Sequence, residues 1–319
     1  MGDVRSLRFR IFVLLLAALP SARAVERDIE RKFAVRPGCS LKIDTYRGSI
    51  AVEETDAAEV TVAVHLEINA DSDAEADRIG SALQLDFTAG DNTVAVRARN
   101  PRETGLRFDW RDKDQIGLTY AITVPRECSV DLVTVKGNIT VGSLAGHQSA
   151  RAESGAVFFR RIEGSVDARV ETGDIIVSRC SGPVTLRVMH GTIRTGTVGG
   201  RADLRNDSGD IDVLSARSGI VADCSAGDIT VGFPKGHSGE TTINTSGGGI
   251  YAKIAPEADC LIDASSIWGH VESQLPLQIE SGGLGKSKLT ALLNAGGPRV
   301  TLHANGGHVK ITAFDAELD

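Results

Sequence analysis

The hydrophobic and polar positions of residues 137–232 repeat with a period of 18 residues. Two residues after a Gly, each unit places an Ile or Val, and the six Gly residues are Gly137, Gly155, Gly173, Gly191, Gly209 and Gly227. The following residues alternate between apolar and polar, which is the pattern of a strand with one buried face. Nine residues after the first Gly comes a second Gly, or Ser218 in one unit, and then another alternating run. Each unit therefore predicts two short strands and two corners.

One such unit has an apolar face on each strand that it cannot bury alone. Stacking the units at the roughly 4.8 Å spacing of neighbouring strands gives every strand a partner above and below. The recurring Gly residues suit tight corners, where a Cβ atom is unfavourable. The sequence thus predicts an all-β fold, a β-solenoid similar to a parallel β-helix with 18-residue coils, over residues 136–319.

The region before this repeat has a different pattern. Residues 25–135 contain several alternating runs typical of strands, and near residues 72–84 they contain one helical pattern. Ser72 is an expected helix N-cap, with Glu75 three residues later as in a capping box. Residues 100–113 are polar and charged, which predicts a surface loop. We therefore divide the chain into residues 1–24, a β-rich region 25–135 and the solenoid 136–319.

The first 24 residues have the pattern of a secretory signal peptide. Arg5, Arg8 and Arg10 precede an apolar run, and small residues stand at positions 22–24, where cleavage would occur. The mature chain is then exported, to the periplasm or the extracellular space. No later run of the sequence is long and apolar enough to predict a transmembrane helix.

Composition and charge narrow the function further. The chain has 35 Gly and 4% aromatic residues, in keeping with short strands and Gly corners. The leader holds four Arg and one Asp, so the mature chain carries 31 basic and 41 acidic side chains, a formal charge of −10. Binding to nucleic acid requires a basic face, so this charge argues against a nucleic-acid partner.

Three stretches of the sequence resemble a known family. They are "SLKIDTYRGSIAVEETDAAEVTV" from Ser40, "ITVPRECSVDLVTVKGNITV" from Ile122 and "GGPRVTLHANGGHVKI" from Gly296, and the serial Gly units lie between the last two. The chain is similar to the bacterial β-strand-repeat family of unknown function labelled putative adhesins, whose relatives are called auto-transporter adhesin head domains. The resemblance implies an exported all-β protein without an assigned reaction. His270 and His308 depart from it, because the repeat more often has Asp there.

The candidate binding residues form one exposed column, five residues after the second Gly of a unit. Four consecutive units place Arg there, namely Arg151, Arg169, Arg187 and Arg205, and the next unit has Asp223. One interpretation is a solvated face of alternating charge, because acidic residues flank the column. The other is a linear array that binds an anionic envelope glycan through paired hydrogen bonds to its carboxylates or phosphates.

Other polar residues have competing interpretations. Asp174, Asp210 and Asp228 follow the first Gly and suggest either turn caps, which we favour, or Ca²⁺ ligands. His270 and His308 could stack if their coils adjoin, but two His alone are a weak metal signal. We therefore predict no metal site and no cofactor.

The five Cys of the mature chain do not form a recognisable framework. Cys180 and Cys224 fall in inward columns and are expected to be small buried residues. Cys39 and Cys128 both come shortly after a Pro and are expected to begin equivalent strands. Whether these two pair as a disulfide stays open.

We expect a non-enzymatic, adhesin-like solenoid with a structural or binding role at the cell envelope, and no catalytic residue is predicted. One alternative is a hydrolase or lyase acting on polysaccharide with paired carboxylates, for which Asp210, Asp212 and Asp228 are the nearest candidates. Another is a sensor or scaffold module that recognises a second envelope protein through an open end coil.

Overall fold

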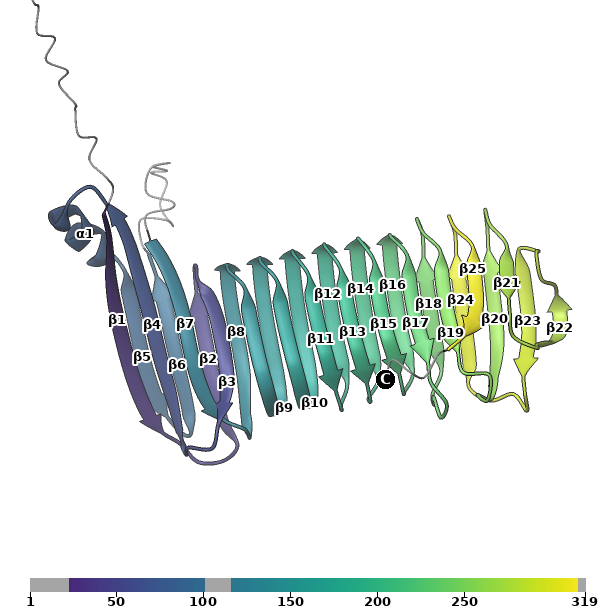
Figure 1. Ribbon diagram of the computed structural model, residues 1–319, viewed down its shortest axis with the longest axis horizontal. Coiled ribbons are helices and arrows are strands. Elements are labelled where there is room, and N and C mark those ends of the chain that lie inside the picture. Colours follow the sequence, from purple (N-terminus) through teal and green to yellow (C-terminus); the bar gives the residue numbers. More distant parts are fainter. Residues whose placement is uncertain (1–22, 101–115, 315–319) are drawn as a thin grey trace, which may run out of the picture.

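The computed structural model describes residues 23–100 and 116–314. They form an elongated stack of short strands with one helix near the N-terminal end (Figure 1). The expected signal peptide lies outside the described residues except for Arg23 and Ala24, where β1 begins, and the expected surface loop lies outside them except for Asn100. Across residues 23–100 and 116–314, no helix combines the length and the apolar character needed to cross a bilayer.

The strands form two ladders that face each other across a thin core. In spatial order, ladder 1 contains β1 (Arg23–Ala34), β4 (Glu59–Ala70), β7 (Ile116–Pro125), β3 (Ser49–Thr55), the first parts of β9 (Ile139–Ser154) and β10 (Val157–Thr172), β11 (Ile175–Cys180), β13 (Ile193–Val198), β15 (Ile211–Ala216), β17 (Ile229–Phe233), β19 (Ile250–Ile254), β25 (Val309–Ala313) and β21 (Val271–Ser273). All neighbours from β7 onward are parallel.

Ladder 2 forms the opposite face. In spatial order it contains β5 (Gln84–Gly90), β6 (Thr93–Arg99), β2 (Cys39–Thr45), β8 (Cys128–Lys136), the second parts of β9 and β10, β12 (Val184–His190), β14 (Ala202–Ser208), β16 (Ile220–Ala226), β18 (Thr241–Thr245), β24 (Arg299–Ala304), β20 (Cys260–Ser266), β23 (Lys288–Leu293) and β22 (Gln278–Gly282). Because β9 and β10 continue round a corner from ladder 1 into ladder 2, the 25 strands of the described residues join one sheet. The predicted all-β solenoid is therefore confirmed.

The 18-residue period sets the register of the central coils. Residues 18 apart are direct partners in neighbouring strands, as Ile175 is with Val157 and with Ile193. The first apolar column of the repeat is wholly buried, and its members are Ile139, Val157, Ile175, Ile193, Ile211 and Ile229. Equivalent positions in successive coils have the same environment. Residues 18 apart in the sequence therefore stack into one column of the buried core.

At both ends of the stack the spatial order of the coils differs from their order in the chain. The coil β24–β25 lies between β18–β19 and β20–β21, although it comes last in sequence. Figure 1 shows these two strands in yellow between green neighbours. At the other end, β2–β3 lies between β6–β7 and β8–β9. Antiparallel strands then close the ladders, with β1, β4 and β5 at one end and β22 and β23 at the other.

The expected boundary at residue 136 falls between two strands of the same stack. β8 ends at Lys136 and β9 begins at Ile139, and both strands pair with partners from the N-terminal region. The hydrogen-bonded ladders therefore continue across this point. The division into two regions stays a prediction, drawn from the change in sequence pattern.

The helix α1 (Asp73–Gly80) forms where the sequence predicts one, and it is shorter than the range 72–84. Ser72 is its N-cap, and the Oγ atom accepts a hydrogen bond from the backbone N–H of Glu75. The Glu75 carboxylate accepts from the N–H of Asp71, one residue before the N-cap. Ala76 and Ile79 are buried, so a single apolar edge holds the helix against the strands.

The first Gly of each unit lies at a corner where the backbones of successive coils almost touch. Gly191 has a φ of 142°, and a Cβ atom there would lie 2.0 Å from the carbonyl oxygen of Gly173. Buried polar side chains donate hydrogen bonds to carbonyl groups of such corners. Asn206 donates to Gly191 over 2.9 Å, and Thr245 donates to Gly227 over the same distance. The Gly column thus follows from close stacking as well as from the turn.

Gly236 stands nine residues after Gly227, so the period of the sequence places it in the second Gly column, and this assignment is wrong. Gly236 does not stack on the corner of the preceding coil, because a Cβ atom there would meet no atom within 4 Å. A Cβ atom on Gly219 would instead lie 2.6 Å from the carbonyl oxygen of Glu240. Residues 234–240 lengthen this corner, so Gly236 lies in the added loop rather than in the column.

Candidate ligand-binding surface

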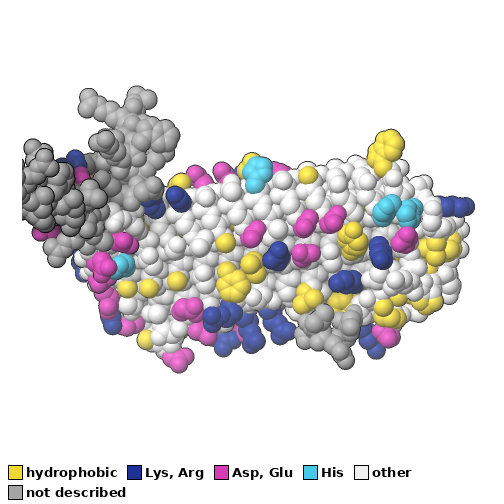
Figure 2. Space-filling view, turned by 45° about the horizontal axis from the view of Figure 1, so that its top comes forward, with side chains coloured by type: hydrophobic (Ala, Val, Ile, Leu, Met, Phe, Trp, Pro, Cys, Tyr) yellow, Lys and Arg dark blue, Asp and Glu magenta, His cyan; other side chains and the backbone are white. Residues whose placement is uncertain are grey.

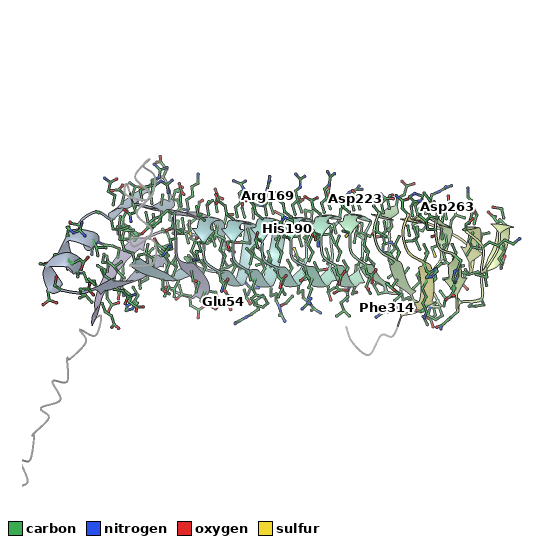
Figure 3. The ribbon with its side chains drawn as sticks, turned by 90° about the horizontal axis from the view of Figure 1, so that it is seen from above. Glu54, Arg169, His190, Asp223, Asp263 and Phe314 are labelled. Atoms are coloured by element: carbon green, nitrogen blue, oxygen red, sulfur yellow. The ribbon has the colours of Figure 1, made fainter. Side chains whose placement is uncertain are left out.

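Strands β9, β10, β12 and β14 bring the four predicted Arg residues together in one column. Arg169 is the direct partner of both Arg151 and Arg187, and Arg205 follows Arg187. Neighbouring residues on each strand point into the core, so the Arg side chains point outward, and all four are exposed. At a strand spacing of about 4.8 Å, the column is about 14 Å long. Figure 3 shows Arg169 on the long side of the stack that also carries Asp223, with Glu54 and Phe314 on the opposite side.

Most of the positive charge in this column is not neutralised by a direct ion pair. The Arg205 Nε atom lies 3.5 Å from the Asp203 Oδ1 atom. Considering the described residues alone, Arg151, Arg169 and Arg187 have no carboxylate oxygen within 4.0 Å. Of the four Arg residues, only Arg205 makes a direct ion pair with a flanking carboxylate among the described residues. The other three guanidinium groups keep their hydrogen-bond donors directed to solvent.

The Arg column has uncharged or acidic residues at both ends. Val133 is the partner of Arg151 on the N-terminal side, and Asp223 is the partner of Arg205 on the other. The Asp223 carboxylate accepts a hydrogen bond of 2.8 Å from the Asn244 side chain. The Arg column is thus a line of four positive charges on an acidic protein, with acidic residues beside it on β9, β10 and β14.

A second Arg pair on ladder 1 was not identified from the sequence. Arg161 and Arg179 are direct partners, and both are exposed. They stand six residues after the first Gly of their units, so the same 18-residue alignment could have found them. The nearby Arg194 Nε atom lies 3.9 Å from the Asp212 carboxylate. On the face shown in Figure 2, Lys and Arg side chains gather along the lower edge of the middle of the stack.

The Asp residues after the first Gly connect one coil to the next. The Oδ1 atom of Asp174 accepts from the backbone N–H of Thr192 over 2.7 Å, and that of Asp210 accepts from Asp228 over 2.9 Å. Asp228 in turn accepts from the N–H of Gly249. The preferred interpretation as turn caps is confirmed, with the difference that each cap serves the corner of the following coil. In the part of the chain that the structure describes, no group of three or more His, Cys, Asp or Glu residues is placed to hold a metal ion.

These contacts also define the surroundings of the carboxylates considered for an enzyme. Asp210 and Asp228 accept backbone hydrogen bonds, and Asp212 lies beside Arg194. Each carboxylate thus has a neighbouring donor or cation that belongs to the stack itself. Hydrogen bonds at the corners explain the positions of Asp210 and Asp228, and one surface ion pair explains that of Asp212.

His270 and His308 are brought together by the out-of-order coil. Their ring centroids lie 4.1 Å apart, because β25 is the direct neighbour of β21. The backbone N–H of His270 donates to the Nδ1 atom of His308 over 3.2 Å. The His270 ring also contacts the Glu272 carboxylate, and this hydrogen bond lowers the pKa of Glu272. His308 thus takes over the capping contact that Asp makes in earlier coils.

The inward-facing cysteines occupy the predicted columns. Cys180 and Cys224 are buried, and the prediction that they are small core residues is confirmed. Burial raises the pKa of both thiols. Neither sulfur is therefore a reactive group at the surface. The candidate binding groups on the surface of the central coils are charged side chains.

Comparison with solved structures finds three that resemble this chain at low sequence identity. Two solved structures described as a putative adhesin, from Bacteroides fragilis NCTC 9343 and Parabacteroides distasonis ATCC 8503, are 15% and 10% identical to this chain, with TM-scores of 0.39 and 0.32. They cover 92% and 89% of this chain and 98% and 97% of their own. A third structure, described as a putative lipid binding protein from Parabacteroides distasonis ATCC 8503, is 10% identical over 89% of this chain and 96% of its own, with a TM-score of 0.37.

No curated protein matches this chain. Residues 39–312 match the family model described as Toastrack DUF4097, which covers both ladders from β2 to β25. The resemblance to the bacterial β-strand-repeat family is confirmed by this match. The chain belongs to the Toastrack DUF4097 family.

Proposed function

We propose that this chain is an exported, non-enzymatic, adhesin-like solenoid that binds an acidic polymer of the cell envelope. The binding residues are Arg151, Arg169, Arg187 and Arg205. The observation that carries the proposal is the register of this column, which holds four exposed guanidinium groups at equal spacing on a rigid ladder. Three of them have no carboxylate oxygen within 4.0 Å among the described residues.

The linear arrangement favours a polymer over a small anion. A guanidinium group presents a planar fork of N–H donors that matches one carboxylate or phosphate. A single small anion can occupy one or two of these forks, whereas a chain with a negative charge about every 5 Å can meet all four. Each exposed ion pair contributes only about 0.2 to 1 kcal/mol, so useful affinity requires several pairs made together.

The overall charge of the protein adds selectivity. A formal charge of −7 for the whole chain repels polyanions in general. Attraction is therefore expected at exposed groups of basic residues, of which the Arg column between Val133 and Asp223 is the longest identified above. Because the contacts are exposed, binding is expected to weaken as ionic strength increases.

The test compares two double charge reversals with equal net charge. Arg169→Glu with Arg187→Glu removes the centre of the column, and Arg161→Glu with Arg179→Glu alters a stacked, exposed pair on the opposite ladder. Retention of residues 25–319 is measured on polygalacturonate, on inorganic polyphosphate and on neutral dextran. Circular dichroism checks that both variants keep the strand content of the parent.

We expect the first variant to bind polygalacturonate or polyphosphate at least about tenfold more weakly, which corresponds to about 1.4 kcal/mol. The control should change by less than about twofold. Equal loss in the two variants, or loss in the control alone, would rule out the Arg column as the site. The two polymers distinguish carboxylate from phosphate as the anion, and dextran should not bind.

Export is tested separately from binding. Expression of the full chain in a bacterial host, followed by fractionation and N-terminal sequencing, should place a chain that begins at Val25 outside the cytoplasm. A chain that keeps residues 1–24 in the cytoplasmic fraction would contradict this part of the proposal.

A further inference from the structure

Two buried cysteines from distant parts of the sequence lie side by side. Cys39 is the first residue of β2 and Cys128 is the first residue of β8, and they are direct partners in ladder 2. Their sulfur atoms are 2.9 Å apart, and both residues are at most 1% exposed. Both are free thiols in the structure. This contact brings together residues 89 positions apart in the chain.

The backbone holds the two cysteines in this register from both directions. The N–H of Gly38 donates to the carbonyl of Glu127 over 2.8 Å, one residue before the pair. After the pair, β2 and β8 stay in register to Thr45 and Thr134. Neighbouring parallel strands lie about 4.8 Å apart, inside the range of about 4.4 to 6.8 Å over which disulfides join Cα atoms. The strands need no rearrangement before a bond can form.

We propose that Cys39 and Cys128 are a modification site, which is converted to an intramolecular disulfide by a thiol–disulfide oxidoreductase or a small disulfide such as oxidised glutathione. One cysteine thiolate attacks the disulfide of the donor and forms a mixed disulfide, releasing one donor thiolate. The second cysteine thiolate then attacks the protein sulfur and releases the other. The two cysteines lose two electrons and two protons, and the donor disulfide is reduced to two thiols.

Burial determines when this reaction can occur. Desolvation, with the neighbouring Cys39, raises the pKa of the Cys128 thiol, so the folded chain holds little of the nucleophilic thiolate. We therefore expect the bond to form while the chain folds, once β2 and β8 have paired and before the core has buried the two sulfurs. Once formed, it is shielded from small reductants by the same burial.

The other cysteines do not compete for this bond. The sulfur of Cys180 lies 3.2 Å from the carbonyl oxygen of Gly164, and that of Cys224 lies 3.3 Å from that of Gly209. Of the described cysteines, only Cys39 and Cys128 have their sulfur atoms in contact.

The disulfide would covalently link the coil β2–β3 to the stack. The coils on either side of it in space are not the ones next to it in the sequence. The coil β2–β3 lies between β6–β7 and β8–β9, and Cys39 starts this coil. A link to Cys128 ties it to the strand that leads into the regular repeat. This inference does not depend on the Arg column or on the proposed ligand.

The experiment refolds residues 25–319 from the reduced, denatured state, in glutathione redox buffer and, separately, in excess reductant. Each sample is denatured and alkylated without reduction. We expect three alkylated cysteines after refolding in redox buffer and five in reductant. Peptide mapping should recover the peptide of Cys39 linked to that of Cys128. Five alkylated cysteines in both samples, or a link between any other pair, would overturn the proposal.

A second measurement uses matched variants. The melting temperature of the parent chain should be about 5 to 10 °C higher when oxidised than when reduced, because the bond closes a long loop in the unfolded chain. Cys260→Ser should keep this difference, and Cys128→Ser should abolish it. A difference that persists in Cys128→Ser would place the bond elsewhere.

Discussion

Replacement of a corner glycine tests whether the close stacking of coils limits stability. Gly191 lies at the centre of the repeat, and a Cβ atom there would be 2.0 Å from the carbonyl oxygen of Gly173. The backbone N–H groups at these corners also bond to the next coil, and between the two coils that would collide Gly173 donates to His190 over 2.9 Å. In Gly191→Ala the two coils must separate by more than 1 Å at this point or lose that contact. The same geometry recurs at the other stacked glycines of the column.

Two effects determine the magnitude. The φ of 142° is a conformation that residues with a Cβ atom rarely adopt, and the strain is about 1 to 3 kcal/mol. The collision with Gly173 adds about 1 to 3 kcal/mol, as overpacking does in cores. We therefore expect Gly191→Ala to lower the free energy of unfolding by about 2 to 6 kcal/mol, the sum of the two effects. Gly236 is the control, because its φ of 82° is also positive and a Cβ atom there would meet nothing within 4 Å. Gly236→Ala should lose only about 1 to 2 kcal/mol.

The assay is equilibrium unfolding in urea of residues 25–319, followed by circular dichroism. The midpoint should fall much further for Gly191→Ala than for Gly236→Ala. If the two variants differ by less than about 0.5 kcal/mol, strain at positive φ explains both, and the close approach of the coils has no separate effect.

Two further predictions follow from buried polar groups. Thr195 lies in a buried column between Val177 and Val213, and in the described structure its Oγ1 atom has no hydrogen-bond partner. Thr195→Val should raise the free energy of unfolding by about 1 kcal/mol, and a lower urea midpoint would contradict this. Burial lowers the pKa of His237 below its ordinary value of 6.5, and the neutral ring contacts the Ala216 carbonyl. As the pH falls below 6.5, the unfolded chain therefore takes up the proton first and stability decreases, whereas His237→Gln should show a flatter dependence of the urea midpoint on pH.

The period of the sequence was enough to predict the central coils. In-register stacking gives each position the environment of the residue 18 places earlier, so Ile175 and Ile193 share one buried column, and Arg169 and Arg187 share one exposed column. The strand pattern, the Gly corners and the placement of the Arg column therefore follow from sequence alone. The ion-pair partners of the Arg side chains do not, because they depend on rotamers that the pattern leaves free.

The order of the coils at the two ends could not be predicted in the same way. A repeat indicates that units stack, but it does not indicate which unit is the neighbour of which once an antiparallel hairpin such as β22–β23 intervenes. For the same reason the contact between Cys39 and Cys128 stayed open. The lengthened corner at residues 234–240 was misread, since Gly236 matched the expected spacing without sharing the stacked geometry.

The inserted coil β24–β25 has a consequence for how the chain reaches its native state. A simple solenoid can add coils one after another, because each new coil needs only the one before it. Here β20–β21 has no native parallel partner until residues 299–313 have been synthesised. The C-terminal part must therefore assemble as a unit of higher contact order, and its folding is expected to be slower than that of the regular coils. A ribosome-bound chain that ends before Arg299 would hold β18 and β19 as open edges, a state that a chaperone would need to protect until the last coil arrives.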